Sequence, residues 1–234
     1  MKILFSDYDN TLFRNEEEII KNIKYVNEFI HRGNMFVIAS GRSYSDLLPE
    51  LEKYNIPFHY LVLDNGANIY DKDINLLYSF YIEDNISKSI YDLVKDNEYL
   101  IIKNIYSVDV KDSNYLSNCT KMNFVFNNIN EGYRLKEYID NKYSNYVNAY
   151  LSLKSDRISL EIISNKTNKG NGVKLISELN NIDKDNIYVI GDNNNDIQMI
   201  KMFNGYSVNT AIEELKIVSI KSYDGVYELI KEIL

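Results

Sequence analysis

Hydrophobic residues along the chain fall into short apolar runs separated by longer stretches with helical spacing. The short, mainly apolar runs of three to five residues that indicate buried strands lie at residues 3–5, 35–39, 60–63, 187–190 and 206–208. Between and after them, apolar residues recur every three or four positions, which predicts helices over residues 16–32, 43–54, 173–179, 197–202 and 226–233. Strand and helix in alternation predict parallel strands joined by right-handed crossovers, and therefore an α/β fold.

Helix-capping and turn residues support several of these elements. Asn15 is a good N-cap for the first helix, and Glu18 stands three residues later, where a capping box needs it. Gly33 is placed to end that helix. Asn65-Gly66 is a turn signal, and the apolar residues on either side of residues 71–73 predict a hairpin.

The alternation changes between about residues 81 and 164. Helical spacing over residues 86–97 and 131–143 is mixed there with short strand patterns, at residues 101–110, 122–126, 149–153 and 157–163. A mixture of this kind predicts an α+β subdomain inserted in the first fold. We therefore expect a discontinuous Rossmann-like core, residues 1–81 and 165–234, and an inserted cap domain, residues 82–164.

Composition narrows the class of protein. The 234 residues carry a net charge of −8, which argues against nucleic acid as a partner because phosphate binding needs clustered Lys and Arg. No stretch approaches the roughly 20 apolar residues of a membrane span, so we expect no membrane partner. The only cysteine, Cys119, cannot form an intramolecular disulfide, and we expect it to be a small buried residue. These features predict a cytoplasmic protein, and they leave its oligomeric state open.

Acidic residues follow two of the predicted strands. Asp7 and Asp9 come after the first strand, and Asp192 and Asp196 come after the strand at residues 187–190. A solvated acidic turn would explain Asp7 and Asp9 taken alone. Because ligands collect at the carboxyl ends of strands in open α/β sheets, the two pairs together predict a shared hard cation such as Mg²⁺. A calcium-binding EF-hand loop is excluded, since Ile197 stands where that loop needs glycine.

Two further stretches are candidates for anion binding. Ser40-Gly41-Arg42 lies between a strand and a helix, where a hydroxyl, a backbone N–H and a fixed positive charge could meet a phosphate. An ordinary strand-to-helix turn is the alternative. Lys169 lies near a helix start, where a cation does not favour the helix dipole, which suits another use for it. A role as an ordinary surface lysine is the alternative.

Four segments, in chain order, carry a family resemblance: Asp7-Tyr8-Asp9-Asn10-Thr11, Ser40-Gly41-Arg42, Lys169-Gly170 and Gly191-Asp192-Asn193-Asn194-Asn195-Asp196. They resemble the four motifs of the haloacid dehalogenase superfamily of phosphotransferases. The Asn65-Gly66-Ala67 turn, the insertion between the second and third motifs, and the Asn209-Thr210-Ala211 and Asp224-Gly225-Val226 segments resemble its Cof-type, or type IIB, hydrolases. The resemblance covers the whole chain. Asn10 departs from the glycine common at its position, which bears on loop geometry rather than on chemistry.

The resemblance implies a role for each motif. Asp7 would be the nucleophile that forms an aspartyl-phosphate, and Asp9 the acid that protonates the leaving alcohol and then activates water. The implied Mg²⁺ ligands are Asp7, the Asp9 backbone carbonyl, Asp192 and, directly or through water, Asp196. The implied phosphate contacts are Asn10, Ser40, Gly41 and Lys169. Arg42 and Asn195 would contact either the substrate or the residues that surround it.

The implied function is a Mg²⁺-dependent phosphatase of small phosphorylated metabolites, such as sugar phosphates or phosphorylated cofactors. A phosphomutase or phosphotransferase would use the same motifs, and a non-catalytic phosphate-sensing module would keep only the fold. The cap would close over the core and select the substrate. Within it, Lys121 and Arg157 could meet an anionic substrate, although solvated surface is the simpler interpretation of both.

Overall fold

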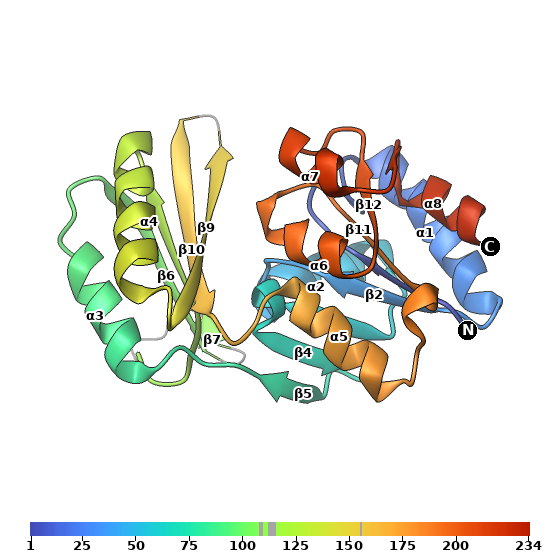
Figure 1. Ribbon diagram of the computed structural model, residues 1–234, viewed down its shortest axis with the longest axis horizontal. Helices are drawn as coiled ribbons and strands as arrows, with labels where there is room; N and C mark the ends of the chain where they lie inside the picture. The colour runs from blue at the N-terminus through green and yellow to red at the C-terminus, as the bar shows by residue number, and fades with distance from the viewer. Residues whose placement is uncertain (108–109, 112–115, 155) are drawn as a thin grey trace. The chain divides into compact units, whose positions relative to one another are not determined.

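The computed structural model describes residues 1–107, 110–111, 116–154 and 156–234. Contacts divide the chain into two compact units (Figure 1). The first unit consists of residues 1–77 and 168–234, and the second of residues 78–167. The second unit is thus an insertion in the first, and each is described by itself below.

An eight-stranded sheet forms the centre of the first unit, in the order β13-β12-β11-β1-β2-β3-β4-β5. Its strands are β1 (Ile3–Ser6), β2 (Met35–Ala39), β3 (Tyr60–Leu63), β4 (Asn68–Asp71), β5 (Leu76–Ser79), β11 (Ile187–Gly191), β12 (Asn204–Val208) and β13 (Ser222–Tyr223). The strands from β13 to β3 run parallel, whereas β4 pairs antiparallel with β3. The α/β core predicted from the sequence is therefore confirmed. The hairpin predicted around residues 71–73 is confirmed as well, since β4 and β5 are hydrogen-bonded neighbours and the Asp71 backbone N–H donates to the Asn75 carbonyl oxygen.

Helices flank this sheet. They are α1 (Glu16–His31), α2 (Tyr44–Tyr54), α5 (Lys169–Leu179), α6 (Ile197–Met202), α7 (Glu213–Val218) and α8 (Val226–Ile233), with short 3₁₀ turns η1 (Asp64–Gly66), η2 (Lys184–Asn186) and η3 (Asn194–Asp196). Helices α1 and α8 pack side by side, as do α5 and α6 (Figure 1). Strands β1 and β2 are fully buried between the layers because every residue in them is apolar except Ser6, whose hydroxyl donates to the Asp7 carbonyl oxygen.

Strand order places a topological switch point at β1. The chain runs from β1 to β2 and β3 on one side of it, while β11 and β12 lie on the other side. The register pairs Ser6 with Ile190 of β11 and with Ile38 of β2, so these three parallel strands end at nearly the same level. The loops after β1 and β11 therefore leave the sheet next to each other, at the edge where open α/β sheets bind ligands.

Over its described residues, the second unit is an antiparallel sheet with two helices. The sheet has the order β7-β6-β8-β10-β9, and its core residues lie between the sheet and the helices. The elements are α3 (Asp84–Val94), β6 (Leu100–Ser107), β7 (Val110–Lys111), β8 (Cys119–Phe126), α4 (Ile129–Tyr143), β9 (Val147–Lys154) and β10 (Arg157–Ser164). Cys119 is fully buried in this core, as expected. The strand predicted over residues 101–110 includes residues 108 and 109, which lie outside the described residues.

Some local predictions were only partly right. Asn15 does cap α1, with its side chain accepting from the Glu18 backbone N–H at 2.9 Å. The capping box is incomplete, however, because the Glu18 carboxylate accepts from the Arg14 guanidinium instead. Gly33 follows the helix in a left-handed conformation, with φ of 80°, as expected of a helix-ending glycine. Leu179 was expected on the apolar face of α5, but it is 49% exposed.

Candidate active site

Two acidic loops meet at the carboxyl ends of β1 and β11. The Asp7 backbone N–H donates to the Ile190 carbonyl oxygen at 3.0 Å, so Asp7 continues the pairing of β1 with β11 by one residue. Asp192 directly follows Gly191, the last residue of β11. Both carboxylates are thus fixed by strands that the apolar core holds in place.

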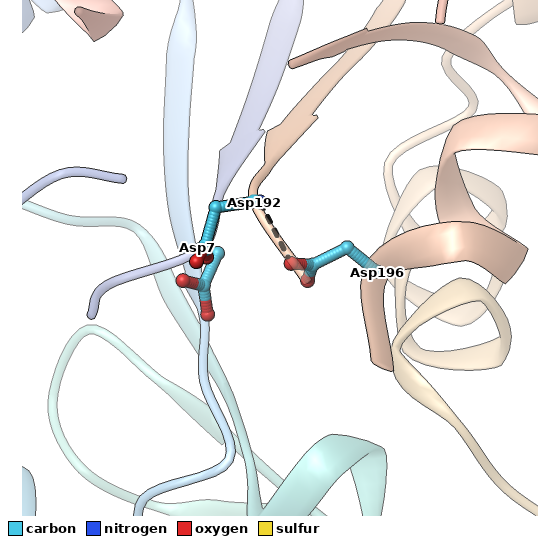
Figure 2. A group of neighbouring side chains, drawn as sticks. All are labelled: Asp7, Asp192 and Asp196. Atoms are coloured by element: carbon cyan, nitrogen blue, oxygen red, sulfur yellow. Dashed lines mark hydrogen bonds between the residues drawn. The ribbon is translucent and has the colours of Figure 1, made fainter. Parts of the chain in front are cut away.

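Three buried carboxylates gather at this position. Asp7, Asp192 and Asp196 are 5%, 7% and 0% exposed, and each offers an oxygen within 4.8 Å of the oxygens of the other two (Figure 2). Three negative charges this close and this well buried repel one another strongly, so they need compensating positive charge or protons.

Lys169 supplies part of that charge. Its ammonium group, fully buried at the first residue of α5, donates to Asp7 Oδ1 at 2.5 Å and to Asp196 Oδ1 at 2.7 Å. Asn168 caps the helix, with its side chain accepting from the Asn171 backbone N–H. The unusual position of this lysine, noted from the sequence, is explained by two carboxylates that lie beside the helix start. One cation against three carboxylates leaves the cluster short of positive charge.

Asp196 organises the second loop. Its Oδ2 accepts from the backbone N–H groups of Asp192 and Asn193, both at 3.0 Å, and Figure 2 draws the bond from Asp192. Gly191 makes room for this arrangement, because a Cβ atom there would lie 2.4 Å from the Asp196 carboxyl carbon. With its two oxygens already engaged, Asp196 fixes Lys169 and the Asp192 loop.

Burial dominates the proton affinity of the cluster. It raises the pKa of Asp7 well above its ordinary value, against the lowering effect of Lys169 and with a further increase from Asp196 and Asp192. Burial also raises the pKa of Asp192 to about 6, assisted by the Asp196 charge. For Lys169, burial opposes the charged form, but Asp196 and Asp7 more than offset it, so its pKa is raised. The Lys169 ammonium is therefore charged, whereas ionising Asp7 and Asp192 costs free energy because both carboxylates are buried.

The donor atoms of the cluster fit a hard divalent cation. They are all carboxylate oxygens, the ligands that Mg²⁺ prefers, and too few to enclose an ion without waters. Asp192 Oδ1 already accepts from the Thr11 hydroxyl at 3.2 Å, which orients this carboxylate. Asp7 and Asp192 are consequently the residues best placed to hold a metal, with charge that a cation would balance.

The Asp9 carboxylate has a different partner from the three clustered carboxylates. Its carboxylate accepts two hydrogen bonds from the Arg42 guanidinium, from Nε to Oδ2 at 2.9 Å and from Nη2 to Oδ1 at 2.7 Å. The resemblance implies that Arg42 contacts either the substrate or the residues around it. In the structure Arg42 binds the side chain proposed as acid and base, and a contact with substrate stays a prediction.

Residues with positive φ angles shape the loops after β1 and β3. Asn10 has φ of 61°, in the left-handed region where Asn is tolerated much better than most residues, so the departure from glycine keeps the loop geometry. Asp64, Asn65 and Gly66 are three consecutive residues with positive φ. The backbone N–H of Asn65 donates to the Ser40 carbonyl oxygen, and the Asn65 side chain accepts from Asn195 at 2.8 Å. This loop therefore supports two of the residues assigned to substrate contacts.

Ser40 and Gly41 sit at the end of β2, next to β1 in the sheet. Ser40 is fully buried, and its hydroxyl accepts from the Arg42 backbone N–H at 3.1 Å, which closes a tight turn. Ser43 then caps α2 by accepting from the Asp46 backbone N–H. The binding roles of Ser40, Gly41, Asn10 and Asn195 stay predictions.

Sequence reasoning missed several residues of this region. The sequence gives no role to Thr11, although its hydroxyl donates to Asp192, and nothing in the sequence indicates that Glu50 accepts from the Tyr8 hydroxyl. In the second unit, the prediction that Lys121 is solvated surface is wrong. It is 2% exposed, and its ammonium lies 4.2 Å from the centre of the Tyr106 ring. Arg157 is exposed, as expected.

None of the helices within the described ranges combines the length and apolar character needed to cross a membrane.

Comparison with known families gives a match along nearly the whole chain. A sequence model described as haloacid dehalogenase-like hydrolase matches residues 4–109 and 101–224. A Buchnera aphidicola protein named as a phosphatase is 26% identical and covers 96% of this chain and 95% of its own length. The 5-amino-6-(5-phospho-D-ribitylamino)uracil phosphatase of Bacillus subtilis is 24% identical, over 92% of this chain and 90% of its own.

Solved structures share the fold. A haloacid dehalogenase-like hydrolase from B. subtilis superposes with a TM-score of 0.85 at 16% identity, covering 100% of both chains. A subclass IIB sugar phosphatase of the same superfamily gives a TM-score of 0.80, also at 16% identity, and covers 100% of this chain and 99% of its own. At these identities the likeness concerns the fold alone.

Proposed function

The chain belongs to the haloacid dehalogenase-like hydrolase family and is an enzyme of the phosphatase type, and from this premise we propose that it hydrolyses small phosphate monoesters through an aspartyl-phosphate on Asp7. The observation that carries the proposal is the cluster of Asp7, Asp192 and Asp196 around buried Lys169. A cluster that is short of positive charge, at a switch point of the sheet, suits a cation and a phosphate together.

Asp7 is the proposed nucleophile. Its carboxylate attacks phosphorus, the bond from phosphorus to the ester oxygen breaks, and a new bond joins phosphorus to Asp7. This divides one difficult displacement into two steps. Lys169, within hydrogen-bonding distance of Asp7, offsets the negative charge that the carboxylate and the phosphoryl group bring together.

Asp9 is the proposed acid and base. It gives a proton to the departing ester oxygen, which becomes an alcohol. In the second step it takes a proton from the water that attacks phosphorus, and the bond to Asp7 breaks to release inorganic phosphate. Such a group must reach the leaving oxygen, and the Asp9 side chain is 48% exposed, which fits that task.

Phosphoryl oxygens are proposed to be held by the Ser40 hydroxyl, the Gly41 backbone N–H, Asn10 and Lys169. Ser40 and Gly41 precede α2, so the positive end of the helix dipole favours an anion beside them.

Asp7 and Asp192 are the side chains that would hold Mg²⁺, with the Asp9 backbone carbonyl and, through water, Asp196. Such an ion, when bound, lets a carboxylate approach a phosphate dianion by balancing their charge. The substrates are proposed to be sugar phosphates or phosphorylated cofactors of the cytoplasm, in keeping with the sugar phosphatase and the ribitylaminouracil phosphatase among the similar proteins.

Phosphate release from a panel of phosphorylated sugars and cofactors tests the proposal. The panel is assayed with Mg²⁺, with EDTA, and with the variants Asp7→Asn and Asp192→Ala. We expect release that needs both the metal and Asp7, and weaker metal dependence with lower activity in Asp192→Ala.

If the folded Asp7→Asn variant still releases phosphate, Asp7 is not the nucleophile. No release from any compound, but transfer of phosphate between two sugars, would identify a phosphomutase or phosphotransferase instead.

A further inference from the structure

The Asp9 carboxylate is held in one orientation by a single side chain. Arg42 donates to both of its oxygens, at 2.9 Å from Nε and 2.7 Å from Nη2, which is the paired geometry that only a guanidinium provides. Asp9 lies in the loop after β1, and its side chain is 48% exposed. Without Arg42, a side chain this open to solvent would sample several rotamers.

Arg42 is itself held from the other side. Its Nη1 donates to the Asp46 carbonyl oxygen at 3.3 Å and lies 3.9 Å from Glu50 Oε1, both on α2. The guanidinium carbon lies 4.9 Å from the centre of the Tyr8 ring, within range of a cation–π contact. The Tyr8 hydroxyl donates to Glu50 Oε2 at 3.2 Å, so ring, carboxylate and guanidinium form one connected group.

This group joins three segments that the sequence separates. Tyr8 and Asp9 lie after β1, Arg42 in the turn after β2, and Glu50 on α2. The Tyr8 ring is fully buried and stacks on Phe13, at 5.9 Å between ring centres, so it gives Arg42 a rigid support. All three guanidinium nitrogens have a hydrogen-bond partner: Nε and Nη2 donate to Asp9, and Nη1 donates to the Asp46 carbonyl oxygen.

We propose that Arg42, supported by Tyr8 and Glu50, is a positioning residue that orients the Asp9 carboxylate toward the ester oxygen of the substrate, and that it is not a phosphate ligand. The proposal rests on the phosphatase function proposed above. Each carboxylate oxygen has two acceptor positions, so the two bonds from Arg42 leave the others available for a proton. Arg42 acts on the step in which the phosphorus–ester oxygen bond breaks and Asp9 gives its proton to that oxygen.

The test compares two substrates that differ in their need for the proton. An alkyl phosphate such as glycerol 2-phosphate releases a strongly basic alkoxide unless it is protonated, whereas p-nitrophenyl phosphate releases a stable phenolate. The value of kcat/KM reports the steps up to phosphoryl transfer to Asp7. For Arg42→Ala we expect a loss on the order of 100-fold for the alkyl phosphate, as for a misplaced reacting group, and a much smaller loss for the aryl phosphate.

Arg42→Lys separates positioning from phosphate binding. Lysine keeps the positive charge and binds phosphate as a point charge, but it cannot donate to both Asp9 oxygens in the guanidinium geometry. We therefore expect Arg42→Lys to resemble Arg42→Ala on the alkyl phosphate. Each variant is first compared with the wild type in thermal unfolding, so that a loss of activity caused by misfolding is recognised.

Asp9→Asn provides the second arm. If Arg42 acts only through Asp9, then Arg42→Ala costs nothing further in the Asp9→Asn background, which a double-mutant cycle measures. Arg32→Ala is the matched control, because Arg32 also binds a carboxylate, Glu28 at 2.7 Å, but in an exposed pair at the end of α1. It should leave both substrates unaffected.

Equal losses for both substrates with a raised KM, or an Arg42→Lys enzyme close to the wild type, would overturn the proposal and make Arg42 a phosphate ligand. An additive double mutant would also overturn it. A wild-type protein that hydrolyses neither substrate, nor any compound of the wider panel, would overturn the phosphatase function together with this inference, which is a distinguishable result.

Discussion

The buried Lys169 ammonium provides the most direct test of the charge balance in the site. Methionine has nearly the length of lysine but no charge, so Lys169→Met removes the cation and leaves Asp7 and Asp196 without their shared donor. Breaking a buried ion pair by deleting one partner costs about 3–5 kcal/mol. We expect a loss of that size in the free energy of unfolding of the metal-free protein near neutral pH.

Lys174→Met is the matched control on the same helix. Lys174 pairs with Glu178 at 3.8 Å, and the two side chains are 60% and 63% exposed. An exposed pair of this kind is worth about 0–1 kcal/mol, so the control should be close to the wild type. Urea unfolding in EDTA, followed by far-ultraviolet circular dichroism, measures both variants against the wild type.

The pH dependence of the loss identifies its origin. Burial already raises the pKa of Asp7, and Lys169 lowers it, so removing Lys169 raises it further. The folded variant then binds more protons than the unfolded chain, and its stability increases as the pH falls toward the ordinary range of carboxyl groups. The difference between Lys169→Met and the wild type should shrink at about pH 5. A loss no larger than that of Lys174→Met, or one independent of pH, would refute the charge-balance argument.

Three further predictions follow from the same region and from the first helix. The pKa of Asp192 is raised to about 6, and metal binding needs the ionised carboxylate, so the increase in unfolding temperature that Mg²⁺ produces should fall steeply between about pH 7 and about pH 5; an unchanged increase would contradict the raised pKa. Gly191→Ala and Gly172→Ala both introduce a Cβ atom closer than 2.5 Å to a side chain, and each should lower the free energy of urea unfolding by about 1–3 kcal/mol. Only Gly191→Ala displaces Asp196, so only this variant should lower phosphate release by the folded protein. Asn15→Ala should cost about 1 kcal/mol in the same unfolding assay, through the lost N-cap bond, with no change in activity.

The fold and the position of the site could be predicted because the signals for them are local. Apolar runs fix which segments are buried strands, and acidic residues placed directly after two of them mark the edge where ligands bind. The switch point then brings Asp7 beside Asp192. The signal for Lys169 is also local, because a cation at the start of a helix lies at the unfavourable end of the helix dipole.

Side-chain partners could not be predicted, since they depend on packing between distant segments. Arg42 has several possible partners by sequence, and only the position of α2 and the Tyr8 ring directs it to Asp9. Glu18 had the spacing of a capping-box residue, but Arg14 offered a guanidinium, which makes stronger bonds to a carboxylate than a backbone N–H does. Lys121 has no signal for burial in the sequence, because the Tyr106 ring beside it belongs to another strand of the cap sheet.

The measurement that most directly tests the central claim is the detection of a phosphoryl group on Asp7. Asp9→Asn removes the proposed acid and base, so p-nitrophenyl phosphate should still transfer its phosphoryl group to Asp7, while hydrolysis by water is slowed. Peptide mass spectrometry after rapid acid quenching, with Mg²⁺ present, should find one phosphoryl group on the peptide that contains Asp7, and none in Asp7→Asn/Asp9→Asn. A folded variant that releases p-nitrophenol but carries no phosphoryl group, or carries it on another residue, would contradict the proposed intermediate.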